Sequence, residues 1–125
     1  MEIMVYQIDK NFVYFKSDYG LACGIWKDEE EPILGMYSVE IDVVDKIYYN
    51  DIKLTSSQEL VLSNIGDKII ISAFMIDYFD GCVTLQFGEN IIEVITEKNE
   101  QFKTLCGKNV TFCVTEIEIY DEHIL

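Results

Sequence analysis

The sequence predicts a mainly β protein: a curved antiparallel sheet that forms a partly open barrel or a sandwich, with one or two short helices. Short apolar runs alternate with polar residues at the period of a half-buried strand. Clusters of Asn, Asp, Gly and Ser separate these runs, as in hairpins. The chain has 125 residues, half of them hydrophobic, which is enough for one domain over residues 1–125. The order of its carboxy-terminal two-thirds is compatible with an OB-like barrel.

The first quarter of the chain predicts a three-stranded meander. Strands are expected at residues 2–8, 12–16 and 21–26, because polar turns at residues 9–11 and 17–20 separate these apolar runs. Residues 27–35 then form an acidic loop that holds the single proline, Pro32, and ends at Gly35. The interruption is short and implies no domain boundary.

A long alternating run predicts a strand over residues 36–49, with Glu40 and Asp42 on its polar side. Asp45 falls on the apolar side, so a bend or bulge is expected there, because a buried unpaired carboxylate is costly. The alternative is that Asp45 lines a site. A short strand over residues 52–55 follows a tight turn at Asn50 and Asp51.

Two segments predict short helices. Residues 56–65 begin with Ser56 and Glu59 in capping-box spacing and stop at Gly66. Residues 96–106 show helical spacing, with Thr96 as the expected N-cap and Gly107 after the end.

The remaining runs predict three consecutive antiparallel strands and a final long one. Residues 68–79 are apolar on both sides, as in a central strand, and tight turns lead to strands at residues 82–87 and 91–95. In the last run, residues 108–120, the apolar phase slips between Val114 and Ile117, which predicts a β-bulge at Thr115 and Glu116. No segment of the sequence repeats at a fixed period.

The residue types needed for most catalytic and metal sites are sparse. His123 is the single histidine, no two of the four cysteines have C-x-x-C spacing, and no phosphate-binding glycine motif is present. We therefore expect no catalytic residue, no metal, no cofactor and no enzymatic activity. Cys23, Cys82 and Cys113 are expected to be reduced and buried in strands. One alternative stays open, a carboxylate hydrolase that uses Asp45 and Asp77.

Charge gives the strongest indication of a partner. The chain has 23 acidic residues, nine lysines and no arginine, for a formal charge of −14. Nucleic-acid binding relies on cationic side chains, so no nucleic-acid partner is expected. The sequence contains neither a cationic leader nor a long apolar segment, which predicts a cytoplasmic protein that does not bind membranes. Steering by an acidic surface favours a basic protein as the partner.

These expectations lead to one main functional hypothesis, an acidic protein that neutralises a basic partner, as bacterial immunity proteins neutralise nuclease-type toxins. The alternatives are a β-barrel that binds a small ligand, an accessory subunit, and a homo-oligomer formed through an edge strand. The predicted partner-binding residues are acids from two segments and a pair of tyrosines that follows them: Asp28, Glu29, Glu30, Glu31, Glu40, Asp42, Tyr48 and Tyr49.

Overall fold

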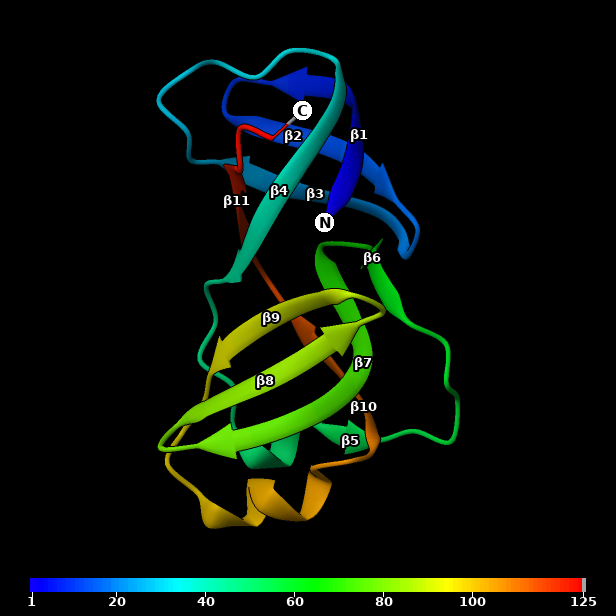
Figure 1. Cartoon of the computed structure of the whole chain (residues 1–125), viewed down its shortest axis with the longest axis vertical. Helices are drawn as coiled ribbons and strands as arrows, with labels where there is room; N and C mark the ends of the chain where they lie inside the picture. Colours follow the sequence, from blue (N-terminus) through cyan, green and yellow to red (C-terminus); the bar gives the residue numbers. More distant parts are fainter. Residues whose placement is uncertain (125) are drawn as a thin grey trace.

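The computed structural model describes residues 1–124, which form two β units stacked along the longest axis of the molecule (Figure 1). The first unit contains β1 (Glu2–Asp9), β2 (Phe12–Ser17), β3 (Gly20–Trp26), β4 (Gly35–Val43) and β11 (Ile117–Asp121). Its strands close into a barrel in the order β1-β2-β3-β11-β4. The prediction of a mainly β fold with a barrel is confirmed.

The second unit is a sheet in the order β5-β10-β7-β8-β9, with β6 paired to the start of β7. Its strands are β5 (Lys53–Leu54), β6 (Val61–Ile65), β7 (Lys68–Phe79), β8 (Cys82–Phe87), β9 (Asn90–Ile95) and β10 (Asn109–Val114). Two 3-10 helices, η1 (Tyr49–Asp51) and η2 (Glu100–Leu105), lie at the lower end in Figure 1. The predicted antiparallel meander of β7, β8 and β9 is confirmed.

The two units repeat one structural plan at a spacing of 70 residues. In the first unit Met4 pairs with Lys16, and in the second Phe74 pairs with Gln86. Every β1–β2 pair recurs 70 positions later in β7–β8, including the bulge between residues 5 and 7 and between residues 75 and 77. The β2–β3 and β8–β9 registers match in the same way.

The repeat is preserved in burial rather than in residue identity. Between residues 4–26 and 74–96, only Val13/Val83 and Ile25/Ile95 are identical. Positions buried in one unit are nevertheless buried in the other, for example Phe15 and Leu85, both fully enclosed. The sequence itself shows no repeat, because a sheet constrains the alternation of apolar and polar residues and leaves their identity free. The repeat is therefore visible only in the strand pairing and the burial.

Each unit is completed by a segment from the other half of the chain. After β4 the chain leaves the first unit, and Ile47 pairs with Thr96 at the end of β9. After β10 it leaves the second unit, and β11 pairs with the end of β3 at Trp26. The hydrogen bonds correspond: Glu97 N–H donates to Ile47 O, and Lys27 N–H donates to Ile119 O. The two segments are therefore exchanged between the units.

The two crossing segments lie side by side. Val44 N–H donates to Glu116 O at 3.2 Å, and Thr115 donates from its N–H and its hydroxyl to the Asp45 carboxylate at 3.1 and 2.9 Å. The bend predicted at Asp45 is present, and β4 ends at Val43 rather than at residue 49. The β-bulge predicted at Thr115 and Glu116 within one long strand was wrong. β10 ends at Val114, and the phase slip marks the crossing into β11, which begins at Ile117 in the other unit.

The helix predicted over residues 56–65 was wrong. Residues 61–65 form β6, in which Leu62 is fully buried opposite Ile71. Residues 55–59 instead form local turns, in which Thr55 and Ser57 hydroxyls accept the N–H groups of Ser57 and Glu59; such bonds compete with a helix. The second predicted helix is the shorter η2, whose N-cap is Asn99, because Thr96 is taken up by its pairing with Ile47.

The units contact each other through the turn between β2 and β3. Tyr19 donates its hydroxyl to Phe87 O at 2.9 Å and accepts the Leu62 N–H at its own carbonyl at 3.0 Å. Gly20 has φ of +138°, and a Cβ there would lie 2.9 Å from the Ser63 Cβ, so this approach requires glycine. Within residues 1–124, no helix has the length and apolar character needed to cross a bilayer.

Candidate functional site

The outer surface of β4 and β11 is acidic. Glu40 and Asp42 are exposed on β4, and on the neighbouring β11 Tyr120 lies opposite Glu40 while Glu118 lies opposite Asp42. Strand alternation explains this arrangement, because the intervening Ile41 is directed into the barrel core. We call Glu40, Asp42, Glu118 and Tyr120 the acidic face.

One lysine lies beside the acidic face. Lys27 Nζ is 3.5 Å from Glu118 Oε2, and because both side chains reach water the pair stabilises the fold only weakly. Removal from water, together with the Glu118 and Asp42 carboxylates, raises the pKa of the Tyr120 phenol above its ordinary value. Tyr120 therefore stays a neutral hydrogen-bonding group among the carboxylates at neutral pH.

Residues 27–34, which we call the acidic loop, connect β3 to β4 beside this face. Glu29, Glu30 and Glu31 are exposed. Two hydrogen bonds fix the loop: Trp26 Nε1–H donates to Glu30 O at 2.7 Å, and Ile33 N–H donates to the Tyr37 hydroxyl at 3.0 Å. The loop thus presents its carboxylates from a held backbone.

Asp28 connects the acidic loop to the carboxy-terminal segment. His123 Nε2 lies 2.8 Å from Asp28 Oδ2, and His123 Nδ1 lies 3.4 Å from Asp121 Oδ2. These contacts are ionic only when the imidazole is protonated. The three residues could also ligate a cation, but each imidazole nitrogen is directed at a carboxylate. Sequence analysis gave His123 no catalytic or metal-binding role, and the structure places it against the loop.

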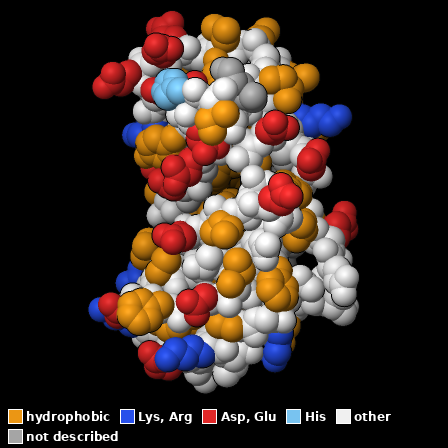
Figure 2. All heavy atoms as spheres, in the orientation of Figure 1, with side chains coloured by type: hydrophobic (Ala, Val, Ile, Leu, Met, Phe, Trp, Pro, Cys, Tyr) orange, Lys and Arg blue, Asp and Glu red, His pale blue; other side chains and the backbone are white. Residues whose placement is uncertain are grey.

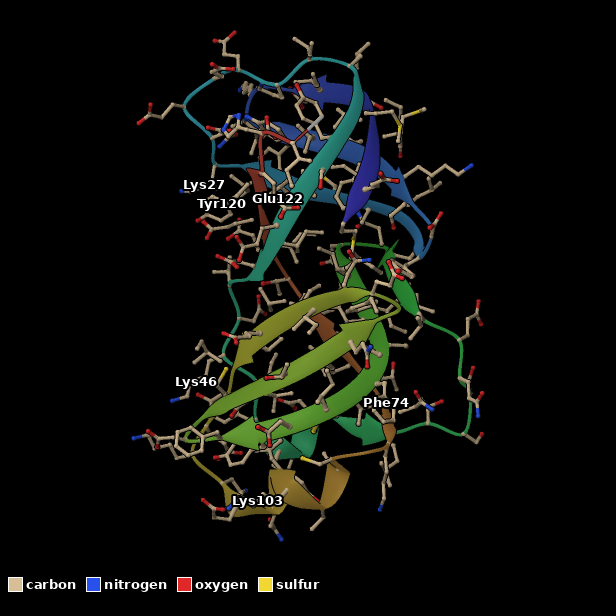
Figure 3. The ribbon with its side chains drawn as sticks, viewed as in Figure 1. Lys27, Lys46, Phe74, Lys103, Tyr120 and Glu122 are labelled. Carbon is tan, nitrogen blue, oxygen red and sulfur yellow. The ribbon has the colours of Figure 1, made fainter. Side chains whose placement is uncertain are left out.

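The eight predicted partner-binding residues fall into two groups. The six acids lie on the first unit, at the acidic loop and on β4, whereas the two tyrosines lie at η1 in the second unit. Tyr48 is exposed, with Lys46 Nζ 5.9 Å from its ring centre. Tyr49 packs edge-on against Phe102 and is partly buried. In Figure 3, Lys46 marks this second group, far from Lys27 and Tyr120 at the first.

Negative charge is concentrated on the first unit. Residues 1–43 and 117–124 hold twelve acidic residues and three lysines, a formal charge of −9. Residues 44–116 hold eleven acidic residues and six lysines, a formal charge of −5, although this part of the chain is longer. In the face shown by Figure 2, acidic side chains are denser over the upper half, which is the first unit.

A hollow of about 480 Å³ opens beside the acidic loop, and we call it the Trp26 hollow. Its walls combine apolar side chains with carboxylates and come from β1, the β1–β2 turn and the loop: Ile8, Lys10, Asn11, Trp26, Asp28, Glu29, Glu31 and Pro32. A hollow of similar size in the second unit has the opposite balance, with Lys46, Lys53 and Lys68 beside two aspartates.

The side chains considered for catalysis have structural roles or are scattered. Asp45 accepts hydrogen bonds from Thr115 at the crossing, and Asp77 is exposed at the β7 bulge, where it accepts the Tyr78 N–H. Burial raises the pKa of the thiols of Cys23, Cys82 and Cys106, which keeps them protonated and poorly nucleophilic. Cys23 and Cys82 are only partly buried and Cys113 is exposed, contrary to the expectation that all three are buried.

Comparison of the chain with protein-family models, with curated protein sequences and with solved structures gave no match. The candidate site therefore stands on its geometry. Sequence analysis missed Glu118, Tyr120 and Trp26 as parts of it. The slip at Thr115 and Glu116 located the start of β11, but no local signal showed that this strand returns to the first unit.

Proposed function

We propose that this protein is a non-enzymatic inhibitor that binds a basic protein through its first unit, as an immunity protein binds a nuclease-type toxin. The observation that carries this proposal is the acidic face together with the acidic loop, which adjoin each other on one unit. Nucleases bind polyanions and present cationic clefts, so such a surface both attracts them and competes with their substrate.

The first experiment identifies the partner. The full-length protein is immobilised and exposed to lysate from its source cell in low salt, and bound proteins are identified by mass spectrometry. We expect a retained protein with a basic isoelectric point, released at about 0.5 M salt because screening weakens attraction between exposed charges. The purified partner should lose its nuclease activity when it is mixed with the protein.

A charge-reversed variant tests whether the first unit is responsible. The double variant Glu40→Lys/Asp42→Lys should lose the partner while it melts like the native protein, because both side chains are exposed. A partner that is retained by the variant, or that binds equally well in high salt, contradicts the proposal.

The alternative of an accessory subunit is favoured by a separate observation. Met4 and Met36 are 47% and 52% exposed on paired positions of β1 and β4, near Ile33 and Leu34, which are 69% and 62% exposed. A permanent partner that covers this surface would bind independently of salt. The small-ligand alternative has less support, because Phe15, Ile117 and Ile119 fill the barrel of the first unit and are 0% exposed.

A further inference from the structure

The internal repeat offers a comparison for the Trp26 hollow. Ile8 and Trp26, which line it, correspond to Tyr78 and Thr96 in the second unit, 70 positions later in the chain. The backbone equivalence is direct, since Trp26 N–H donates to Asn11 O and Thr96 N–H donates to Gly81 O. The same end of each unit can therefore be compared.

In the second unit this end is filled by a side chain from η2. Phe102 is 0% exposed, stacks on Tyr78 with ring centres 5.3 Å apart, and meets Tyr49 edge-on at 5.4 Å. The Tyr78 hydroxyl accepts the N–H groups of Gly81 and Asn99, which fixes the turn and the following loop over the ring. The chain thus supplies its own aromatic plug.

The first unit has no aromatic plug from the equivalent loop; instead Tyr37 of β4 packs edge-on against Trp26, with ring centres 4.9 Å apart. The acidic loop contains no aromatic residue, and its two large apolar side chains, Ile33 and Leu34, are directed to solvent. Trp26 replaces the smaller Thr96 and supplies part of the missing volume from within the barrel. Beside it the hollow of about 480 Å³ remains, with Trp26, Ile8 and Pro32 as its apolar wall.

The rim of the hollow is negatively charged. Asp28, Glu29 and Glu31 outnumber Lys10 among the lining residues. The Asp28 side chain is only 15% exposed, and His123 Nε2 lies 2.8 Å from its Oδ2. Asp28 is therefore taken up by His123, and the exposed Glu29 and Glu31 are the carboxylates that a ligand can reach beside the apolar wall. This combination suits a ligand with an apolar stem and a cationic head.

We propose that the Trp26 hollow receives an arginine side chain of the basic partner. A guanidinium can stack on an aromatic or proline surface and donate several N–H bonds to carboxylates, whereas an ammonium is a compact, strongly hydrated charge. This inference rests on the proposed function and names the group that the partner inserts. The hollow would then hold the arginine of the bound partner, and the acidic face would attract the partner before it binds.

Trp26 is the single tryptophan of the chain, so its fluorescence reports on the hollow directly. The full-length protein is titrated with a capped pentapeptide, Gly-Gly-Arg-Gly-Gly, and with versions that carry citrulline, lysine or phenylalanine at the centre. We expect a saturable change with arginine and binding about tenfold weaker or more with citrulline, which has the same shape without the charge.

Two variants of matched charge complete the test. Glu31→Gln removes one exposed charge from the rim of the hollow and should weaken arginine-peptide binding about tenfold. Glu100→Gln removes one charge from the equivalent loop of the second unit and should leave binding unchanged. Circular dichroism melting checks that both variants fold.

Several outcomes overturn the inference: no saturable response to the arginine peptide, equal binding of citrulline, tighter binding of lysine or phenylalanine, or equal weakening by the two variants. The proposed function fails separately. If the peptide binds as expected but no basic protein is captured, the arginine site in the Trp26 hollow is supported and the proposed inhibitor function is contradicted. If a basic protein is inhibited while Glu31→Gln binds it normally and the Trp26 fluorescence does not change, the proposed inhibitor function is supported and the arginine site is excluded.

Discussion

The two units share their backbone plan and differ in what they present to solvent. Where β4 carries Glu40 and Asp42, the positions 73 residues later hold Cys113 on β10 and Thr115 just after it, and both are exposed. Inward positions are buried in both units. The comparison shows that the buried positions specify the same fold in both units. The outward positions are not constrained in this way, so those of the first unit can carry an acidic surface.

The largest expected effect concerns the shared core. Phe15→Ala and Leu85→Ala remove equivalent, fully buried side chains and should each lower the free energy of unfolding by about 2–5 kcal/mol. Because each unit is completed by a strand of the other, both variants should melt in one cooperative transition, as measured by circular dichroism and calorimetry. Two separate transitions, with each variant shifting only one, would contradict the strand exchange.

A second effect concerns the place where the exchanged strand enters the first unit. A Cβ at Gly24 would lie 2.7 Å from Ile119 Cδ1, whereas the equivalent position of the second unit holds Val94. Gly24→Ala should therefore destabilise the protein by about 1–3 kcal/mol in urea unfolding. Adding Ile119→Val, which removes that methyl group, should restore part of the loss. Additive costs would show that Ile119 does not pack where we place it.

The charges of the acidic loop should affect the rate of association with the basic partner rather than the stability of the fold. Glu29→Lys/Glu30→Lys/Glu31→Lys should slow association with the basic partner by about tenfold in low salt, because exposed charges steer encounter. The matched control, Glu59→Lys/Glu93→Lys/Glu100→Lys, reverses three exposed acidic side chains of the second unit. Stopped-flow association should separate the two variants, and equal rates would exclude the acidic loop from the interface.

The smallest effect concerns the crossing. Thr115→Val removes the hydroxyl bond to Asp45 and keeps the backbone bond, so it should cost about 0.5–1.5 kcal/mol. Chemical denaturation measures this difference. A loss above that range would mean that the crossing contributes more than one partly exposed hydrogen bond.

Local patterning predicted most strands, because alternation is visible over a few residues. It indicated the bend at Asp45 and the slip of the apolar phase at Thr115 and Glu116. It could not show that the chain crosses between the units at both places, because the strands that pair there lie far apart in sequence. It misassigned residues 61–65 because Leu60, Val61 and Leu62 next to a capping box resemble the start of a helix.

The candidate site was predicted in part. Glu40 and Asp42 were assigned to an outward face from strand phase alone, which the structure confirms. Tyr48 and Tyr49 were grouped with them by nearness in sequence, but the crossing after Val43 carries them into the other unit. Glu118 and Tyr120 join the face only through long-range pairing of β11 with β4.

The most direct test compares two variants of identical net charge. Glu40→Gln/Asp42→Asn in the first unit and Glu59→Gln/Glu93→Gln in the second each change the formal charge by two, from −14 to −12, and all four side chains are exposed. Association rates with the purified basic partner are measured over a range of salt concentrations. The account predicts that only the first variant slows association and flattens its salt dependence. Equal slowing by both would show that total charge, rather than the acidic face of the first unit, governs binding.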